Sequence, residues 1–234
     1  MKKKVAIIQS NYIPWKGYFD IINDSDLFVF YDDVQFTKND WRNRNKIKCE
    51  GGTMWLSVPV GQELNRNINE VTIKQGVWER KHFKNMEQYY HKAPYFKIYK
   101  EFFAHVYLER KWENLSELNQ FLVKTIATDF LGSKTVYDNS ENYKPEGKRL
   151  ERLLDLIKKC GGDVYISGPS AKNYIDEDEF TKCGVGIEFK DYSSYPEYPQ
   201  FYPPFEHYVS IIDLLFNTGP DAAYYIWGWR EDKK

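Results

Sequence analysis

The chain has 234 residues, enough for one large domain or two small ones, and its formal net charge is -1. This charge balance excludes a global positive field that would draw the protein onto nucleic acid or anionic lipid. Hydrophobic residues make up 42% of the chain and aromatic residues 18%, so we expect a folded protein with many half-buried rings.

Targeting signals are missing from the sequence pattern. Lysines follow Met1, but only about four apolar residues come next before Gln9, whereas a secretory signal needs roughly 7–15 and a membrane span roughly 18 or more. The cysteines are widely separated and odd in number, as expected for reduced thiols. We therefore expect a cytoplasmic protein without a membrane span.

The first predicted elements form a βαβ unit. Apolar runs at residues 5–8 and 27–31 predict two buried strands, and apolar residues at helical spacing over 18–22 predict a short helix between them. This order implies parallel pairing with a right-handed crossover.

The middle of the chain changes its pattern. Residues 46–58 predict a hairpin with a turn at Gly51 and Gly52, and residues 71–73 predict a further strand. Three helical segments follow, the last with Asn114 and Glu117 in the spacing of a capping box, and they cover residues 78–90, 95–107 and 114–130.

The last third returns to alternating strands and helices. The Pro- and Tyr-rich tract 192–205 predicts an irregular loop that covers a surface. We expect a single α/β domain over 1–234, with a βαβ-type, mostly parallel sheet, an inserted hairpin and residues 78–130 as a helical insertion or subdomain. The remaining predicted elements are strands at 136–137, 163–166 and 187–189 and helices at 146–160 and 211–216.

Polar residues follow three of the predicted strands, at residues 9–11, 32–33 and 167–170. Ligands of open α/β sheets lie outside the carboxyl ends of the strands. If these strands are neighbours, their ends line one cleft for a small molecule. The candidate substrate-binding residues are Gln9, Asn11, Tyr12, Trp15, Gly17, Tyr18, Gln35, Lys38, Trp41, Arg42, Arg44, Ser167, Ser170, Lys172 and Tyr174.

Three residues are candidates for proton transfer. Adjacent Asp32 and Asp33 point to opposite sides of an extended segment, so one of them can face the cleft as base, metal ligand or ribose acceptor. Two turn-forming aspartates are the alternative. His207, in a loop beside Glu206, is a candidate general base, whereas His82 is interpreted as a helix-surface residue. No Cys or His pair has metal-ligand spacing, and the sequence names no cofactor.

The turn over residues 12–18 joins the first strand to its helix. Gly17 would let the backbone approach a ligand, and the helix start offers N–H groups to an anion such as phosphate. The alternative is a tight turn with Trp15 packed on the sheet. Arg42 and Arg44 could bind a phosphate or carboxylate of a ligand, or they could belong to a solvated charged loop. Ser170 could equally form part of a polar wall of the site or serve as the N-cap of a following helix.

Several segments together resemble the WbqC-like family over almost the whole chain. They are residues 9–19 (QSNYIPWKGYF), 31–36 (YDDVQF), 41–45 (WRNRN), 55–59 (WLSVP) and 210–219 (SIIDLLFNTG). Members of that family occur in bacterial clusters for O-antigen and other surface polysaccharides. The resemblance therefore implies a role in making or decorating a sugar precursor, and it implies no particular reaction.

These observations lead to a functional hypothesis. We expect an enzyme that acts on a nucleotide-activated, amino-sugar substrate by acyl or aminoacyl transfer. Trp15 and Trp41 would stack on base or sugar, Arg42 and Arg44 would hold phosphates, and one aspartate would take a proton. A glycosyltransferase-like or nucleotidyltransferase-like enzyme and a non-catalytic scaffold for polysaccharide enzymes are the alternatives. A homo-oligomer is compatible with the sequence.

Overall fold

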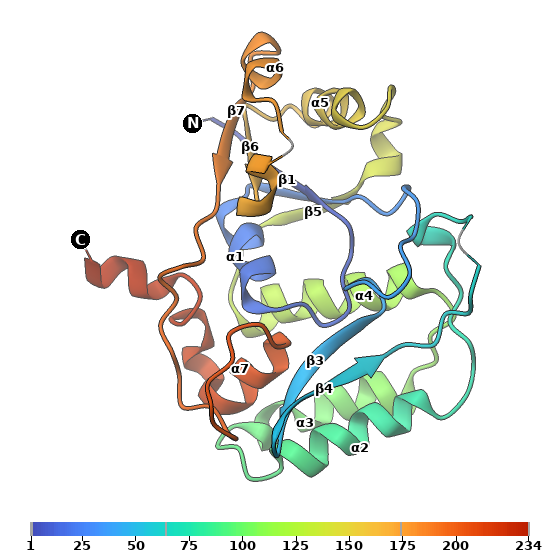
Figure 1. Ribbon diagram of the computed structural model, residues 1–234, viewed down its shortest axis with the longest axis vertical. Coiled ribbons are helices and arrows are strands. Elements are labelled where there is room, and N and C mark those ends of the chain that lie inside the picture. Colours follow the sequence, from blue (N-terminus) through green and yellow to red (C-terminus); the bar gives the residue numbers. More distant parts are fainter. Residues whose placement is uncertain (1, 64, 174, 234) are drawn as a thin grey trace.

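A five-stranded parallel sheet forms the upper half of the molecule (Figure 1). The computed structural model describes residues 2–63, 65–173 and 175–233. The strand order is β5-β2-β1-β6-β7 and every neighbouring pair is parallel, which confirms the predicted α/β class. The strands are β1 (Lys4–Ile8), β2 (Leu27–Phe30), β5 (Val136–Asn139), β6 (Val164–Ser167) and β7 (Gly186–Phe189).

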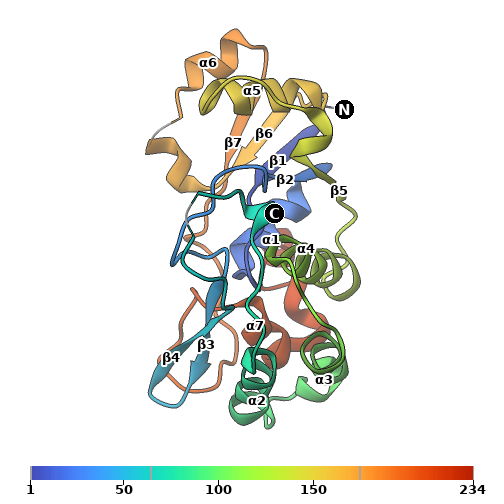
Figure 2. The same ribbon diagram turned by 90° about the vertical axis from the view of Figure 1, so that its right-hand side faces the viewer.

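Helices cover both faces of this sheet (Figure 2). Successive strand residues point to opposite faces, so Ala6 of β1 packs with the side of α1 and α4, while Val5 and Ile7 pack with α5 and α6. The helices are α1 (Lys16–Asp24), α2 (Trp78–Tyr90), α3 (Phe96–Ala104), α4 (Leu115–Thr125), α5 (Leu150–Lys159), α6 (Glu177–Lys182) and α7 (Ile211–Thr218).

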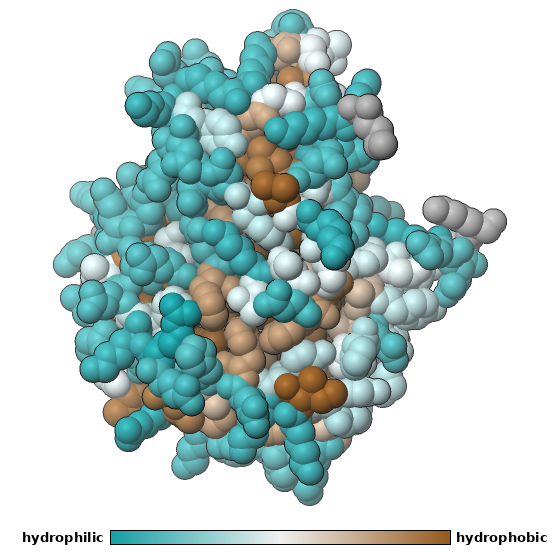
Figure 3. Space-filling view, turned by 180° about the vertical axis from the view of Figure 1, so that it is seen from behind, coloured by the Kyte–Doolittle hydropathy of each residue, from teal (hydrophilic) through white to brown (hydrophobic). Residues whose placement is uncertain are grey.

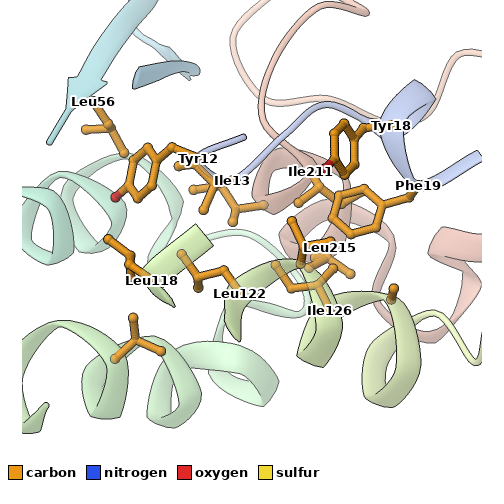
Figure 4. Close-up of a cluster of buried hydrophobic side chains, with 14 of the residues drawn as sticks. Tyr12, Ile13, Tyr18, Phe19, Leu56, Leu118, Leu122, Ile126, Ile211 and Leu215 are labelled. Atoms are coloured by element: carbon orange, nitrogen blue, oxygen red, sulfur yellow. The ribbon is translucent and has the colours of Figure 1, made fainter. Parts of the chain in front are cut away.

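The lower half combines the central helices with a two-stranded antiparallel hairpin, β3 (Arg44–Cys49) and β4 (Gly52–Ser57). Its core continues the core under the sheet without a break. Figure 4 shows how the hairpin, the turn after β1, α1, α4 and α7 meet there. The side chains that meet include Leu56, Tyr12, Ile13, Phe19, Leu118, Leu122, Ile126, Ile211 and Leu215.

The back of the molecule carries an apolar area over α3 and α4 (Figure 3). The partly buried rings of Phe102 and Phe121 stack there with centroids 6.1 Å apart. The guanidinium of Arg110 lies 4.4 Å from the centroid of the Phe121 ring and 4.2 Å from that of Trp112. A cation over aromatic faces shields such rings from water, so this area closes the core.

Some predicted elements are wrong. Residues 71–73 do not form a strand: Thr72 makes one isolated bridge with Asn114, after a 3-10 helix at Ile68–Glu70. The helix expected from residue 146 starts only at Leu150, because Gly147 and Arg149 have positive φ. Helix α6 was not predicted. Within the described residues, none of the helices combines the length and apolarity that crossing a membrane requires.

The tract 192–205 has no helix or strand and is held on the core by two buried carboxylates. The Tyr195 hydroxyl donates to Asp20 (2.6 Å), and the Tyr198 hydroxyl donates to Asp213 (2.7 Å). Tyr90 of α2 also donates to Asp213 (2.7 Å), so the loop is tied to the helical region. The predicted covering loop is thus confirmed as an irregular segment.

His82 lies in the core, and its interpretation as a surface residue is wrong. Only 5% of its surface is exposed, and its Nδ1 lies 2.7 Å from the hydroxyl of Tyr12, which also bonds to the hydroxyl of Tyr107. Burial lowers the pKa of His82 to about 4. The lysine-rich sequence around it hid the fact that this position faces inward.

This burial predicts a pH-dependent stability. An unfolded histidine ionises near 6.5, so between pH 6.5 and about 4 the unfolded state binds more protons at His82 than the folded state does. The free energy of unfolding should therefore fall as the pH drops through this window, by up to about 3 kcal/mol from this group. Urea unfolding measured across the window checks it. An H82Q variant should lose that part of the slope and an H91Q variant should keep it; equal slopes for wild type and H82Q would contradict the assignment.

Candidate functional site

The order of the strands places a topological switch point between β1 and β6. From β1 the chain runs to β2 and β5 on one side of the sheet, and later to β6 and β7 on the other side. Open α/β sheets bind ligands at such a point, outside the carboxyl ends of the strands. A pocket of about 860 Å³ opens there, and we call it the switch pocket. Its lining includes Gln9, Trp15, Tyr18, Tyr31, Arg42, Arg149, Ser167, Ser170 and Tyr192.

The switch pocket gathers residues that lie far apart in the sequence. The strands whose ends carried the predicted polar residues, β2, β1 and β6, are consecutive in the sheet. Of those polar residues, only ones after β1 and β6 line this pocket, whereas Asp32 and Asp33 after β2 border a different one, so the three strand ends do not line one cleft. The floor of the switch pocket is apolar and comes from β1 and α5, through Ile8, Leu150 and Leu153. A large pocket with an apolar floor and few polar groups is typical of small-molecule sites.

Arg42 is the cation that the sequence predicted and that the fold brings to this pocket. Its Nη1 donates to Asn11 Oδ1 (2.7 Å) and its Nη2 donates to Gln9 Oε1, so the two amides of the loop after β1 hold both arms of the fork. The side chain is 13% exposed, and the nearest carboxylate oxygen, on Asp40, is 3.7 Å away. Among the described residues, the buried Nε of Arg42 has no acceptor. The guanidinium is therefore fixed in place with hydrogen-bonding capacity left for an anion.

A smaller pocket of about 210 Å³ adjoins the switch pocket, and we call it the side pocket. Trp15 lines both pockets and forms the wall between them. The two residues that accept hydrogen bonds from Arg42 lie in different pockets: Gln9 lines the switch pocket and Asn11 lines the side pocket. Arg42 lines the switch pocket and is bonded to one residue of each pocket. The side pocket is lined by Asn11, Pro14, Trp15, Trp41, Asn45 and Tyr208.

Gly17 sets the position of Trp15. A Cβ at Gly17 would lie 2.2 Å from the indole ring of Trp15, so only glycine leaves room for it. The indole also contacts Tyr192 and Tyr195 of the covering loop edge-on, with centroids 4.9 and 6.0 Å apart. The missing side chain of Gly17 therefore leaves space for the Trp15 indole. The contact expected between Trp15 and a ligand stays a prediction.

Asp32 and Asp33 point in different directions, as their adjacency implied. The buried Asp32 accepts from the backbone N–H of Ser10 (2.7 Å) through Oδ1 and from the Ser116 hydroxyl through Oδ2. Asp33 pairs with Arg152 of α5 (2.5 Å). Both carboxylates border a polar pocket of about 300 Å³ on the far side of the β2 end, which also includes Asn69, Ser116, Gln120, Asn139 and Ser140.

Some predicted site residues lie outside the two pockets next to Arg42. Tyr12 is fully buried in the core, Gln35 is exposed and bridges to Asn67, and Lys38 is exposed. Arg44 stacks on Trp55 with 4.3 Å between the guanidinium carbon and the ring centroid.

The segment after β6 contributes in part. Ser167 and Ser170 line the switch pocket, whereas Lys172 is exposed with its Nζ 5.3 Å from the Phe189 ring centroid. Ser170 lies inside a 3-10 helix, Pro169–Asn173, so its interpretation as an N-cap is wrong. Tyr174 lies outside the described residues.

His207 is half-buried near the side pocket, one residue before Tyr208. Its ring packs edge-on against Phe205, with centroids 4.6 Å apart. Its Nδ1 is buried and lacks a hydrogen-bond partner within residues 2–63, 65–173 and 175–233. Burial, and secondarily the charge of Lys16, lower the pKa of His207, which favours the neutral ring.

Several residues that line the switch pocket were not among the predicted site residues, and Tyr31, Tyr192 and Arg149 are three of them. Tyr31 ends the second apolar run, and its position alone signalled a strand end. Tyr192 comes from the covering loop, where the richness in tyrosine was the available signal. No sequence pattern marked Arg149 as a site residue. It lines the pocket from the position just before α5, where its backbone has a positive φ of 51°. Within the described part of the chain, no group of three or more His, Cys, Asp or Glu residues has the arrangement of a metal site.

Comparison with known proteins decides the family. The model of the WbqC-like protein family matches residues 9–225. The chain belongs to the WbqC-like family. An uncharacterised protein of Mycobacterium tuberculosis, Rv1507c, is 42% identical over 226 residues, which are 96% of this chain and 97% of that protein. No solved structure matches the chain.

The contact between Gly17 and Trp15 yields a prediction. A G17A substitution should expel the indole or strain the start of α1 and lower the free energy of unfolding by about 1–3 kcal/mol, since overpacking has that cost. Urea unfolding followed by tryptophan fluorescence measures both effects. A G76A control, with no heavy atom within 4 Å of the added carbon, should change stability by less than about 0.5 kcal/mol. Equal stability of G17A and wild type would show that Trp15 does not depend on Gly17.

Proposed function

We propose that the protein is a cytoplasmic enzyme of bacterial surface-polysaccharide precursor biosynthesis that acts on a nucleotide-linked sugar. Acyl or aminoacyl transfer to an amino group of that sugar is the reaction we favour. One observation carries the proposal: a pocket at the switch point of a parallel sheet, with the forked Arg42 at its inner edge. The family likeness supports the polysaccharide context.

The charges of the pocket fit a diphosphate. Arg42 is bonded to the neutral amides of Gln9 and Asn11, with the Asp40 carboxylate 3.7 Å away, and Arg149 also lines the pocket. Arg149 directly precedes the first turn of α5, whose end favours negative charge. In the proposal, these two guanidinium groups bind the phosphates of the nucleotide.

The remaining lining fits a nucleoside. Tyr31 and Tyr192 offer rings for a base, and Ser167 and Ser170 offer hydroxyls for a ribose or a base edge. The volume of about 860 Å³ lies in the range of small-molecule pockets, roughly 300–1,000 Å³. This combination supports a nucleotide rather than a bare sugar as the anchored part of the ligand.

Of the three candidates for proton transfer, His207 fits the general base best. Asp32 and Asp33 already accept hydrogen bonds or pair with Arg152, so in the proposal they position the strand ends. His207 has a buried Nδ1 without a hydrogen-bond partner among the described residues, and its lowered pKa favours the neutral form that a base for an amine needs. Fixed charges near the reacting group then supply electrostatic stabilisation.

Replacement of Arg42 tests the anion site. R42K keeps the positive charge but loses the planar fork of the guanidinium. We expect it to weaken nucleotide binding about 10- to 100-fold, which corresponds to the loss of one or two hydrogen bonds to a charged phosphate. Thermal shift and calorimetry with UDP, dTDP, GDP and CMP, each with and without a linked sugar, provide the measurement. R80K, a change at an exposed position of α2, is the matched control. The proposal fails if wild type binds no nucleotide of the panel, or if R42K binds like wild type.

The base assignment predicts the titration of His207. Its lowered pKa means that the neutral, proton-accepting form persists below pH 6.5. Long-range proton–nitrogen NMR spectra should give a midpoint for His207 below 6.5, with the signal assigned by its loss in H207Q. A midpoint at or above 6.5 would contradict the burial of this ring and its role as a base at neutral pH.

A further inference from the structure

The side pocket is built mainly from flat rings and from Pro14. Trp15 and Trp41 both line it, and Tyr208 completes the wall. Trp41 is 40% exposed and Tyr208 is 61% exposed, although large aromatic residues are usually well buried. Rings that stay accessible around a concavity offer faces to a ligand.

Hydrogen-bonding groups in this pocket are few. The side chain of Asn45 is fully used: Nδ2 donates to the backbone oxygens of Tyr12 (3.2 Å) and Ile13 (2.9 Å), and Oδ1 accepts from the N–H of Lys46 (2.8 Å). Asn11 gives its Oδ1 to Arg42, and its Nδ2 amino group is not used in that bond. The pocket therefore suits a ring that is recognised by stacking and by one or two polar contacts. A nucleobase, whose edge carries several donors and acceptors, would leave most of them unpaired.

The position of the pocket specifies how its ligand is connected. Trp15 lines both pockets, and Arg42, which lines the switch pocket, has one arm bonded to a residue of each. An anion at Arg42 would thus lie in the pocket of about 860 Å³, with the pocket of about 210 Å³ reached past Trp15 and Asn11. A nucleoside diphosphate sugar has this same asymmetry, with a large nucleoside, a central diphosphate and a small sugar ring.

We propose that the side pocket is the pyranose subsite of the site proposed above, in which Trp41 and Trp15 stack on the sugar ring while Arg42 holds the diphosphate. This inference rests on the proposed function and adds the location and the recognition chemistry of the sugar. Asn11 Nδ2 donates to a ring hydroxyl. The aromatic rings of the subsite contact the apolar face of the pyranose, and the sugar then lies near His207.

The chain offers a matched control beside this subsite. Trp55 is 42% exposed and its ring centroid lies 5.5 Å from that of Trp41, yet it does not line the side pocket. Arg44 and Lys46 lie over its ring, with 4.3 and 5.1 Å to the centroid. W41A and W55A therefore remove the same chemical group, with similar exposure, from inside and outside the proposed subsite.

Calorimetry with UDP, UDP-glucose, dTDP and dTDP-glucose tests the subsite. Wild type should bind the glucose derivative of its preferred nucleotide more tightly than the free nucleotide, by about 3- to 10-fold, as expected for stacking on one or two rings. W41A should abolish this preference and leave the affinity for the free nucleotide unchanged. W55A should behave like wild type. An equal preference in W41A and wild type would overturn the subsite and leave the nucleotide site intact.

A second measurement does not depend on nucleotide binding. Saturation-transfer NMR with methyl β-D-glucopyranoside should show contact of the sugar with wild type and W55A and a loss of contact with W41A. Contact with wild type but no binding of any nucleotide would refute the proposed function and keep a saccharide site at Trp41. No contact with wild type, together with equal affinities for nucleotide and nucleotide sugar, would refute the subsite.

Discussion

The buried carboxylate of Asp32 is the constraint on which the site depends. One oxygen accepts the backbone N–H of Ser10, just past β1, and the other accepts the hydroxyl of Ser116 and the amide of Gln120 (3.2 Å) on α4. A carboxylate in the interior is costly unless donors surround it, and hydrogen bonds to a charged acceptor are the stronger kind. Asp32 therefore fixes the end of β2, the loop after β1 and helix α4 relative to one another.

The position of Arg42 follows from this arrangement. Once the loop after β1 is fixed at Ser10, its neighbours Gln9 and Asn11 present their amide oxygens to the two arms of the guanidinium. The amide of Asn119, also on α4, donates to the backbone oxygen of Arg42 (2.8 Å), so the same helix supports both residues. The guanidinium at the switch pocket is thus held by the amides of two residues, of which Gln9 lines the switch pocket and Asn11 the side pocket. An enzyme that handles a diphosphate needs a cation whose geometry is fixed in this way.

Local patterns in the sequence were sufficient for most of the fold and for part of the site. The apolar runs of β1, β2 and β6 predicted the strands, because burial leaves a local signal, and polar residues after β1 and β6 line the switch pocket whereas Asp32 and Asp33 after β2 border another. Arg42 and Trp15, which the sequence analysis named as candidates, line the switch pocket, and their roles toward a ligand stay predictions.

Other features depend on contacts between distant segments. Tyr12 and His82 looked available for chemistry or solvent, but each satisfies the other in the core, and a sequence does not show such a pair. Arg149 and Tyr192 reach the switch pocket through the backbone before α5 and through a loop anchored on Asp20 and Asp213. Val71 and Ile73 are buried in the core and Thr72 between them is exposed, but the segment has no partner strand. The alternation of buried and exposed side chains could not distinguish it from a true strand.

A crystal structure of the protein with bound UDP-glucose or dTDP-glucose would test the central claim most directly. The account predicts the nucleoside in the switch pocket, a phosphate oxygen within hydrogen-bonding distance of the Arg42 guanidinium, and the glucose ring beyond Trp15. A ligand bound instead in the polar pocket beside Asp32 and Asp33, with Arg42 untouched, would contradict it.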